Sequence, residues 1–454
     1  MNKHILIPIF TLLLISLTAS AERVTQQRAA ETAAAFFSNT GAGRLQRQTP
    51  AVRAVMNCGQ AFYIFDNADG NGFVIISGDD AVMPVLGYSF ENCFPKDGNL
   101  PPAFRSWMED MREEILSVRS LGITQSENTA AAWRELEYGT PVVKLETARW
   151  GQEEPFCNLC PVIDGRTAAT GCAATALATI MYHYGWPAKG TGTIPAYTTL
   201  TDRRPIDALT LGHSYAWDSM LADYSSSYTD EQAEAVAVLM RDCGYMIESD
   251  YRSRDNGGTG SFMKDIPAPL IEFMGYDESA RHVSREDYTA QEWLDLMKSE
   301  LDNGRPILYA GCTAANAGHA FVLDGYTDND FFSVNWGWCG ESNGYFLLDA
   351  LNVERNGNLY ELNYLQDAVI GIQPDTGTGP VSEEISLKYD KTAGTVTLTA
   401  SERITVSLTD ADGNAVVEDT AGTSVTLDIR NIGTGDYILK TTGSSRTTEL
   451  TLHL

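Results

Sequence analysis

The chain has 454 residues and a formal net charge of −28, because 60 acidic side chains outnumber 32 basic ones. Such a chain is repelled by nucleic acid and by anionic membrane surfaces, so we expect neither as a partner. Hydrophobic residues make up 43% and charged residues 20% of the chain, as in ordinary globular proteins, and the length predicts about two to four domains.

Residues 1–21 are predicted to be a signal peptide. A basic start precedes an apolar run from Ile5 to Leu17, and Ala19-Ser20-Ala21 offers a cleavage site of small residues. A membrane anchor is the alternative, but the run is shorter than the roughly 20 residues that span a bilayer. We therefore expect an exported protein that begins at Glu22 and is secreted, periplasmic or held at the cell surface.

Residues 22–121 are predicted to form a small α+β unit. A helix is expected over residues 24–38, and a hairpin from the strands Ala61–Asp66 and Gly72–Ser77. A second helix opens at Pro101-Pro102, with apolar residues at helical spacing. The polar stretch 122–139 then predicts a linker to the next domain.

Cys172 is the candidate nucleophile. A helix is predicted from Cys172 to just before Gly185-Trp-Pro187, and Gly171 permits a sharp entry into it. In the first turn of a helix, the unsatisfied N–H groups and the helix dipole favour a thiolate. A buried structural cysteine is the alternative, so the assignment needs a base elsewhere in the chain.

His319 is the candidate base, because it opens a predicted strand, Gly318–Tyr326, beside a glycine. A second strand ending at Asn335, joined through the turn Thr327–Asp330, would lie next to it. The side-chain oxygen of Asn335 would then orient the imidazole, and Trp336 would shield that bond from water. A hydrogen-bonded core histidine and an aromatic turn are the structural alternatives.

Gln152 is the candidate oxyanion donor, together with the backbone N–H of Cys172. A solvated glutamine is the alternative for this residue alone. The chain order Gln, Cys, His, Asn is that of papain-like peptidases, although the papain-type motif around the nucleophile is absent.

Together these segments resemble the streptopain family of cysteine peptidases, to which interpain also belongs. The matching segments are WGQ at 150–152, ATGCAATA at 169–176, MYHYGWP at 181–187, GHAFVLDGY at 318–326 and NWGWCGESNGYF at 335–346. Upstream, GFVIISGDD at 72–80 and PVLGYS at 84–89 are similar to the family's propeptide. One departure is Cys339, where the family pattern has glycine, which puts the local loop in doubt.

The resemblance implies a papain-like α+β catalytic domain over residues 140–374 and endopeptidase activity on proteins or peptides through an acyl-enzyme. It assigns Cys172 as nucleophile, His319 as base, Gln152 as oxyanion donor, and Asn335 with Trp336 as the support of the histidine. It also implies a latent zymogen, in which the propeptide 22–121 inhibits its own enzyme until the linker 122–139 is cut. A Cys-His amidase, a transglutaminase-like acyltransferase and a non-catalytic secreted adhesin are the alternative functions.

Residues 381–454 are predicted to form a small all-β sandwich, because six or seven short alternating segments follow a Gly/Thr linker. It carries no candidate catalytic residue, and we predict that it contacts a cell surface or the secretion machinery.

Two further motifs lie in the catalytic domain. Cys157-Asn-Leu-Cys160 suits half of a zinc site or a redox pair, but no second pair accompanies it, so we predict no metal and no cofactor. The glycine-rich stretch Asn256–Gly260 predicts a loop that borders the substrate cleft. Most of the eight cysteines are expected to be thiols, since their spacing matches no disulfide framework.

Overall fold

The computed structural model describes residues 22–39, 51–68, 71–95, 99–136, 139–253, 258–312, 318–348, 353–355, 358–360, 366–375, 386–390, 395–410, 415–430, 432, 436–442 and 447–453. The predicted signal peptide lies outside these residues. Among the described helices, none has the length and apolar character needed to cross a membrane. The chain divides into two compact units, residues 1–373 and 374–454.

The first part of the larger unit has the predicted helices and hairpin. Its elements are α1 (Gln26–Asn39), β1 (Val52–Asn57), β2 (Phe62–Asn67), β3 (Phe73–Ser77), β4 (Val85–Ser89) and α2 (Pro102–Leu121). Strands β2 and β3 form the predicted hairpin and pair antiparallel, with Ile64 opposite Ile75. The prolines that open α2 suit a helix start, where a missing N–H costs no hydrogen bond.

A third helix, α3 (Glu127–Glu135), occupies much of the stretch that was predicted to be a polar linker. The side chain of Ser126 caps it by accepting a hydrogen bond from the Thr129 N–H at 3.1 Å. Its Trp133 donates to the Val82 carbonyl at 2.8 Å, which ties the helix to the preceding strands. The predicted linker therefore contains a helix, because a good cap and one anchoring tryptophan outweigh the polar composition.

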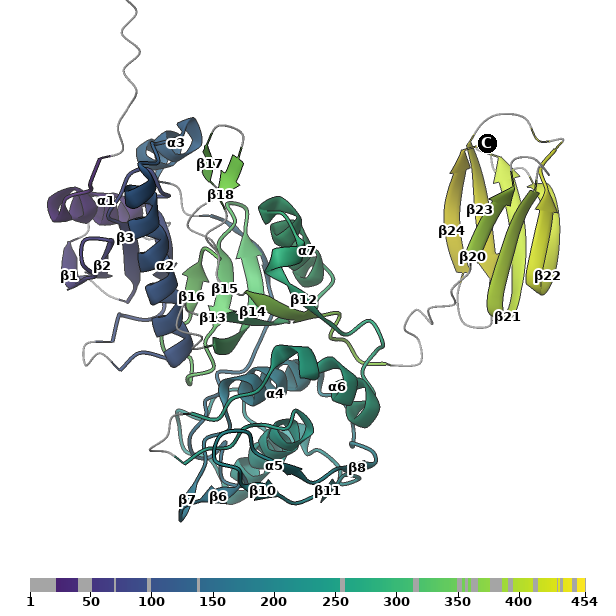
Figure 1. The fold of residues 1–454 in the computed structure, drawn as a ribbon, viewed down its shortest axis with the longest axis horizontal. Coiled ribbons are helices and arrows are strands. Elements are labelled where there is room, and N and C mark those ends of the chain that lie inside the picture. Colours follow the sequence, from purple (N-terminus) through teal and green to yellow (C-terminus); the bar gives the residue numbers. More distant parts are fainter. Residues whose placement is uncertain are drawn as a thin grey trace, which may run out of the picture. The chain divides into compact units, whose positions relative to one another are not determined.

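The rest of the larger unit combines a helical part with a sheet (Figure 1). Its helices are α4 (Cys172–Tyr184), α5 (Asp230–Met246), α6 (Pro267–Met274) and α7 (Ala290–Asp302). Its sheet strands are β5 (Pro141–Lys144), β12 (Arg281–Ser284), β13 (Ile307–Cys312), β14 (Gly318–Thr327), β15 (Phe332–Asn335), β16 (Gly344–Phe346) and β19 (Asp367–Ile370).

Shorter elements complete this part. The small strand pairs are β6 (Val162–Ile163) with β7 (Arg166–Thr167), β8 (Thr193–Ile194) with β11 (Leu209–Thr210), β9 (Tyr197–Thr198) with β10 (Pro205–Ile206), and β17 (Val353–Arg355) with β18 (Asn358–Tyr360). The 3₁₀ turns are η2 (Trp217–Ser219), η4 (Met263–Asp265) and η5 (Arg285–Asp287).

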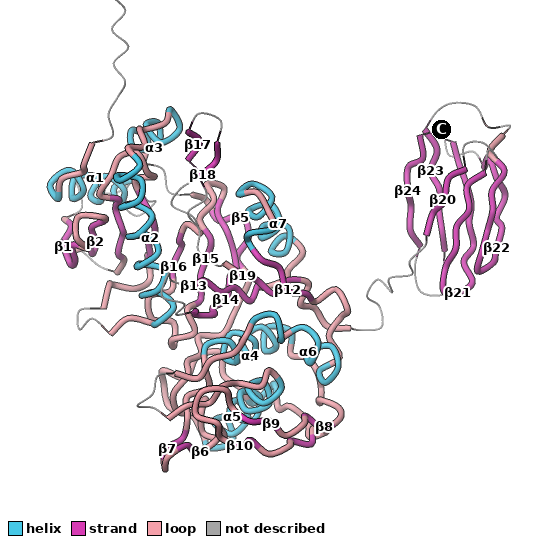
Figure 2. Tube along the Cα trace, in the orientation of Figure 1, coloured by secondary structure: helices cyan, strands magenta, loops and turns pink. Residues whose placement is uncertain are grey.

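One continuous sheet joins the first hundred residues to the second part of the unit. Its strand order is β1-β2-β3-β4-β16-β15-β14-β13-β19-β12, with β5 paired to β14 (Figure 2). The junction is the antiparallel pairing of β4 with β16, where Gly87 lies opposite Phe346. A side chain at Gly87 would meet the Phe346 ring at 2.4 Å, so glycine is required for the two strands to approach this closely.

The junction is also a shared hydrophobic core. Helix α2 contacts β13 and β14, and its buried apolar face joins side chains of those strands and their neighbours in one cluster. That cluster includes Phe104, Trp107, Met111 and Ile115 of α2 together with Leu323, Val334, Trp336 and Phe346. Each such side chain contributes about 1.5–3 kcal/mol when it is buried, so α2 is held firmly against the sheet.

The smaller unit is all-β, as predicted. Its strands are β20 (Ser386–Asp390), β21 (Thr395–Asp410), β22 (Ala415–Asp428), β23 (Asp436–Thr442) and β24 (Thr447–His453). They form one sheet of order β20-β21-β23-β24, with β22 paired to β21. The described strands number five rather than six or seven, because two predicted segments continue through an irregular register between Thr399 and Ile404 as the single strand β21.

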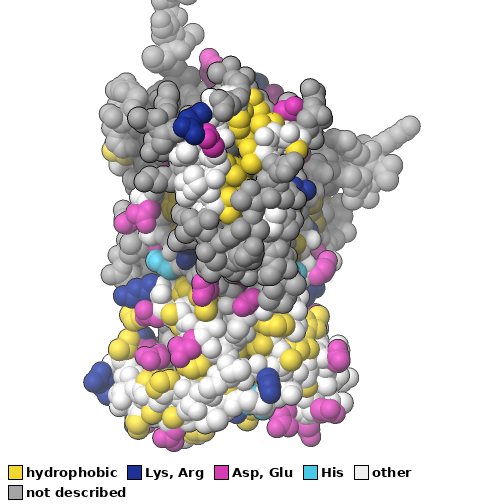
Figure 3. Space-filling model, turned by 90° about the vertical axis from the view of Figure 1, so that its right-hand side faces the viewer, with side chains coloured by type: hydrophobic (Ala, Val, Ile, Leu, Met, Phe, Trp, Pro, Cys, Tyr) yellow, Lys and Arg dark blue, Asp and Glu magenta, His cyan; other side chains and the backbone are white. Residues whose placement is uncertain are grey.

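Charged side chains of both signs are interspersed with apolar and uncharged ones on the face of the molecule drawn in Figure 3. The acidic side chains that Figure 3 colours are therefore not gathered into one patch on this face.

Candidate active site

Cys172 is the first residue of α4, as the sequence predicted. Gly171 before it has φ +90°, and a side chain there would meet the Thr259 carbonyl oxygen at 2.9 Å. Only glycine therefore fits this sharp entry into the helix. The Thr259 hydroxyl donates to the Ala169 carbonyl at 2.7 Å, so the described end of the predicted glycine-rich loop does lie beside the nucleophile's turn.

The start of β14 lies directly against Cys172. The backbone N–H of Ala320 donates to the Cys172 sulfur at 3.4 Å, which puts the neighbouring residue, His319, at the same edge. Strand β13 holds β14 in register, with Gly311 opposite His319. Cys172 and Ala320, which are 148 positions apart in the sequence, thus meet where α4 contacts the sheet strands β13 and β14.

The surroundings of the thiol and of the imidazole both favour the uncharged forms. Burial raises the pKa of the Cys172 thiol, although the backbone N–H groups of Ala320, Ala173 and Cys172 itself oppose this rise. Burial, and then the positive charge of Arg105 on α2, lower the pKa of the His319 imidazole. The thiolate expected from the position at the helix start is therefore not favoured in this form of the protein.

Asn335 lies on the strand next to His319 but not beside it. Strands β14 and β15 pair with Asn335 opposite Val322, which is three residues or about 10 Å along the strand from His319. An irregularity between Leu323 and Gly325 shifts the register by one residue towards His319, which is too little to bring Asn335 beside the histidine.

The Asn335 side chain has other partners in this form. It donates to the Thr147 hydroxyl at 3.1 Å and to the Ala148 carbonyl at 2.8 Å, and its oxygen accepts from the Gly337 N–H at 3.2 Å. Among the described residues, no hydrogen bond joins His319 to Asn335 or to Cys172.

Trp336 is buried and donates to the Ser342 carbonyl at 3.0 Å. Its ring packs on Phe321 at 4.9 Å and on Phe104 of α2 at 5.3 Å between ring centroids, so the predicted propeptide 22–121 touches this side chain directly. Gln152 is half-buried, and its backbone carbonyl accepts from the Thr170 N–H at 3.3 Å. This bond anchors Gln152 to Thr170, which lies two residues before the start of α4.

The segment that follows β4 also forms hydrogen bonds with the loop after Trp336. Asn92 donates to the carbonyls of Gly340 and Asn343 at 3.3 and 3.2 Å. Glu91 pairs with Arg149 at 2.7 Å, next to the segment that carries Gln152. Sequence reasoning missed these contacts and the role of Arg105, because neither has a local signal in the sequence.

Several cysteines are thiols in the structure, including Cys172, Cys58, Cys243 and Cys339. Cys339, at the position where the family pattern has glycine, adopts a positive φ of 54°. No group of three or more His, Cys, Asp or Glu side chains among the described residues is arranged to hold a metal ion.

Comparison with known proteins places this geometry in a family. A model described as the Peptidase C10 family matches residues 150–346. Streptopain of Streptococcus pyogenes is 35% identical over 341 residues, which cover 70% of this chain and 81% of streptopain. The chain belongs to the Peptidase C10 family of streptopain-type cysteine peptidases. The thiol protease/hemagglutinin PrtT of Porphyromonas gingivalis is 31% identical over 399 residues, and the chain spans 45% of the length of that relative.

The first hundred residues match separately. A family model described as Spi protease inhibitor covers residues 21–115. A solved fragment of prointerpain A of Prevotella intermedia superposes with a TM-score of 0.59 at 32% identity, covering 71% of this chain and 98% of the fragment. The predicted resemblance to the streptopain family, with an inhibitor-like propeptide and a papain-like α+β domain, is confirmed.

Proposed function

We propose that this protein is a cysteine endopeptidase made as a latent zymogen, with Cys172 as nucleophile and His319 as its base. The observation that carries this proposal is the 3.4 Å contact from the Ala320 N–H to the Cys172 sulfur, because it brings the start of β14 to the thiol. Membership of the Peptidase C10 family supports the reaction class.

In the proposed reaction, His319 accepts the thiol proton and the Cys172 sulfur attacks the carbonyl carbon of a peptide bond. The Gln152 side chain and the Cys172 N–H donate to the oxygen that becomes negative. The amine leaves with the proton from His319, and water then hydrolyses the thioester, which frees the second product and restores the thiol. Asn335 orients His319 during these steps, and Trp336 keeps water from that bond.

Latency follows from the contacts of residues 22–121 with the site. While α2 is docked, burial and then the charge of Arg105 disfavour the imidazolium. In the same form of the protein, Asn335 is bonded to Thr147 and Ala148 of the catalytic domain. A neutral imidazole without its orienting amide cannot hold the ion pair with Cys172 that makes the sulfur reactive. Removal of the propeptide takes away the charge of Arg105, frees the loop that Asn92 binds and breaks the ion pair of Glu91 with Arg149.

We infer that the activating cut lies on either side of α3 rather than within it. Proteases cut exposed, irregular segments more readily than helices. At the C-terminal end of the linker, Gly139 packs so closely against Asn329 that a side chain would overlap it, so this position is not open to a protease. The exposed turn before Ser126 and the segment between Leu136 and Gly139 remain, of which residues 137–138 lie outside the described residues.

Export is part of the proposal, with proteins or peptides outside the cell as substrates. It rests on the signal-peptide pattern of residues 1–21, which lie outside the described residues. The contact of residues 381–454 with a cell surface or the secretion machinery stays a prediction, because neither family model reaches that unit.

The test is casein hydrolysis and labelling by a thiol-directed active-site probe after activation. Cys172→Ala and His319→Ala should each abolish both, while Asn335→Ala should keep partial hydrolysis. His183→Ala is the matched control, since this histidine at the end of α4 binds the Glu146 carbonyl at 2.8 Å instead of the site. Casein hydrolysis by a folded Cys172→Ala variant would overturn the assignment, and labelling without hydrolysis would favour an amidase or acyltransferase.

A further inference from the structure

The Cys157-Asn-Leu-Cys160 motif plays no part in the proposed peptidase chemistry, yet the fold places its two cysteines at the ends of one turn. The Cys160 N–H donates to the Cys157 carbonyl at 2.9 Å, which closes a β-turn with the two cysteines at its ends. The Cα atoms at the ends of a β-turn lie within about 7 Å, and disulfides span Cα separations up to about 6.8 Å. The backbone is therefore already shaped for a bridge between these residues.

Both side chains face the same small core. Cys157 and Cys160 are thiols and are buried in one cluster with Ile163, Ile206 and Tyr251. The two side chains thus contribute to one small core, as the two halves of a buried disulfide would.

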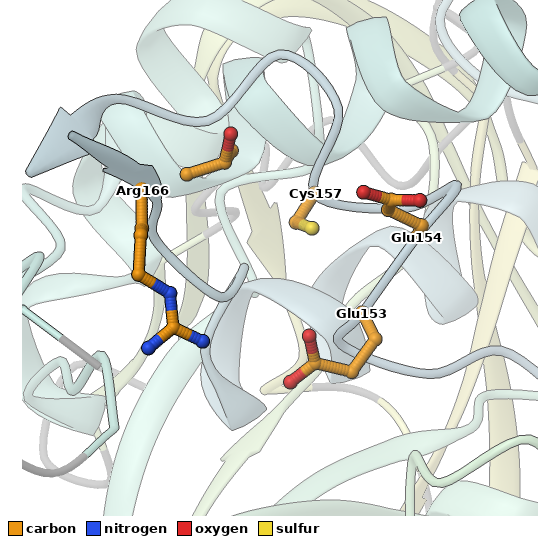
Figure 4. A pocket seen from close by; sticks show the side chains of 5 residues that line it. Glu153, Glu154, Cys157 and Arg166 are labelled. Atoms are coloured by element: carbon orange, nitrogen blue, oxygen red, sulfur yellow. The ribbon is translucent and has the colours of Figure 1, made fainter. Parts of the chain in front are cut away.

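Cys157, although it is only 1% exposed, borders a cavity that opens to solvent. An open cavity of about 510 Å³ is lined by Glu153, Glu154, Cys157, Arg166 and Thr167. Figure 4 shows the sulfur of Cys157 among the labelled side chains of this cavity. Such a volume admits a small organic molecule, and two carboxylates against one guanidinium favour a molecule of positive charge.

We propose that Cys157 and Cys160 are a redox-active dithiol, oxidised to a disulfide by small, positively charged disulfides that enter this cavity. The Cys157 sulfur attacks one sulfur of the small molecule, whose S–S bond breaks, and the first small thiol leaves with the proton that Cys157 loses. Cys160 then attacks the Cys157 sulfur and expels the second small thiol with its own proton. Two protein thiols are oxidised and one small disulfide is reduced to two thiols.

The disulfide closes the turn that follows Gln152. The Cys157 N–H donates to the Glu153 carbonyl at 3.2 Å, and the Gln152 carbonyl holds the Thr170 N–H at 3.3 Å. Oxidation therefore fixes the segment that carries the proposed oxyanion donor, without using the nucleophile.

The experiment uses the full-length Cys172→Ala protein, so that the nucleophile cannot react, and cystamine as the probe. After incubation, remaining thiols are alkylated and the protein is digested with trypsin. The tryptic peptide 150–166 contains Cys157 and Cys160 and no other cysteine. We expect this peptide to resist alkylation, to have lost the mass of two hydrogens, and to recover both thiols in dithiothreitol.

Two variants in this background test the order of events. Cys160→Ser should accumulate a stable cystamine adduct on Cys157, because the resolving thiol is missing. Cys339→Ser is the control and should form the bridge like the parent protein. The proposal is overturned if the parent peptide stays fully alkylatable, if Cys157 bridges a cysteine other than Cys160, or if the adduct persists in the parent without ring closure. The parent carries no change in the motif, so these outcomes do not depend on whether a variant folds.

Discussion

Asp110, at the interface between α2 and the sheet, makes the free energy of unfolding of the precursor depend on pH. One of its carboxylate oxygens is buried without a hydrogen-bond partner among the described residues, and the other lies 4.0 Å from the position of a side chain on Gly311 of β13. Burial, and then the charges of Glu113 and Glu109, raise the pKa of Asp110 from 3.8 to about 7. We predict that Asp110→Asn stabilises the precursor at neutral pH.

The magnitude follows from linkage. A shift of about three pKa units corresponds to about 4 kcal/mol, which we reduce to about 2 kcal/mol because the carboxyl group is partly exposed to solvent. The docked protein binds the proton more tightly than the unfolded chain does. The stabilisation by the protonated carboxyl is thus complete below pH 3.8 and is lost as the pH rises to about 7. Asparagine stays neutral, so the variant should escape this loss.

The assay is urea unfolding of full-length Cys172→Ala precursor between pH 4 and 8, followed by tryptophan fluorescence. All eight tryptophans precede residue 374, so this signal reports on the larger unit alone. The stability gained by Asp110→Asn should grow by about 2 kcal/mol between pH 4 and 7 and then level off. Asp295→Asn, which changes an exposed carboxylate on α7, should show no such growth. A gain that is constant with pH would refute the reasoning.

Three further predictions concern docking, electrostatics and domain organisation. Gly87→Ala should destabilise the precursor by about 1–3 kcal/mol and speed its processing, because the new methyl overlaps Phe346; unfolding midpoints and the rate of cleavage measure both. Arg105→Gln should raise the pKa of His319 in the Cys172→Ala precursor, as followed by NMR titration of the imidazole, and an unchanged or lower pKa would contradict the electrostatic account of latency. A protein ending at Pro374 should fold and, once activated, cleave small peptides like the full chain; a folded but inactive truncation would show that the smaller unit takes part in catalysis.

The sequence was sufficient wherever the signal is local. A glycine before Cys172 and a run of small residues after it predict a helix that starts at the nucleophile, and α4 begins there. Alternating apolar residues separated by a polar turn predict the hairpin of β2 and β3, and the structure has it. These elements depend on backbone conformation and on side chains a few positions apart, so composition and spacing determine them.

The tertiary structure decided what depends on register and on contact between distant segments. The register of β14 with β15 sets Asn335 opposite Val322, three residues from His319, although the sequence suggested that the two residues would lie side by side. The pairing of β4 with β16 and the charge of Arg105 near His319 join residues more than 200 positions apart. Such pairings depend on how whole surfaces pack together, and a short stretch of sequence does not contain that information. The sequence by itself predicted the chemistry of the candidate site, and only the tertiary structure showed that α2 packs against Trp336 and that the charge of Arg105 acts on His319.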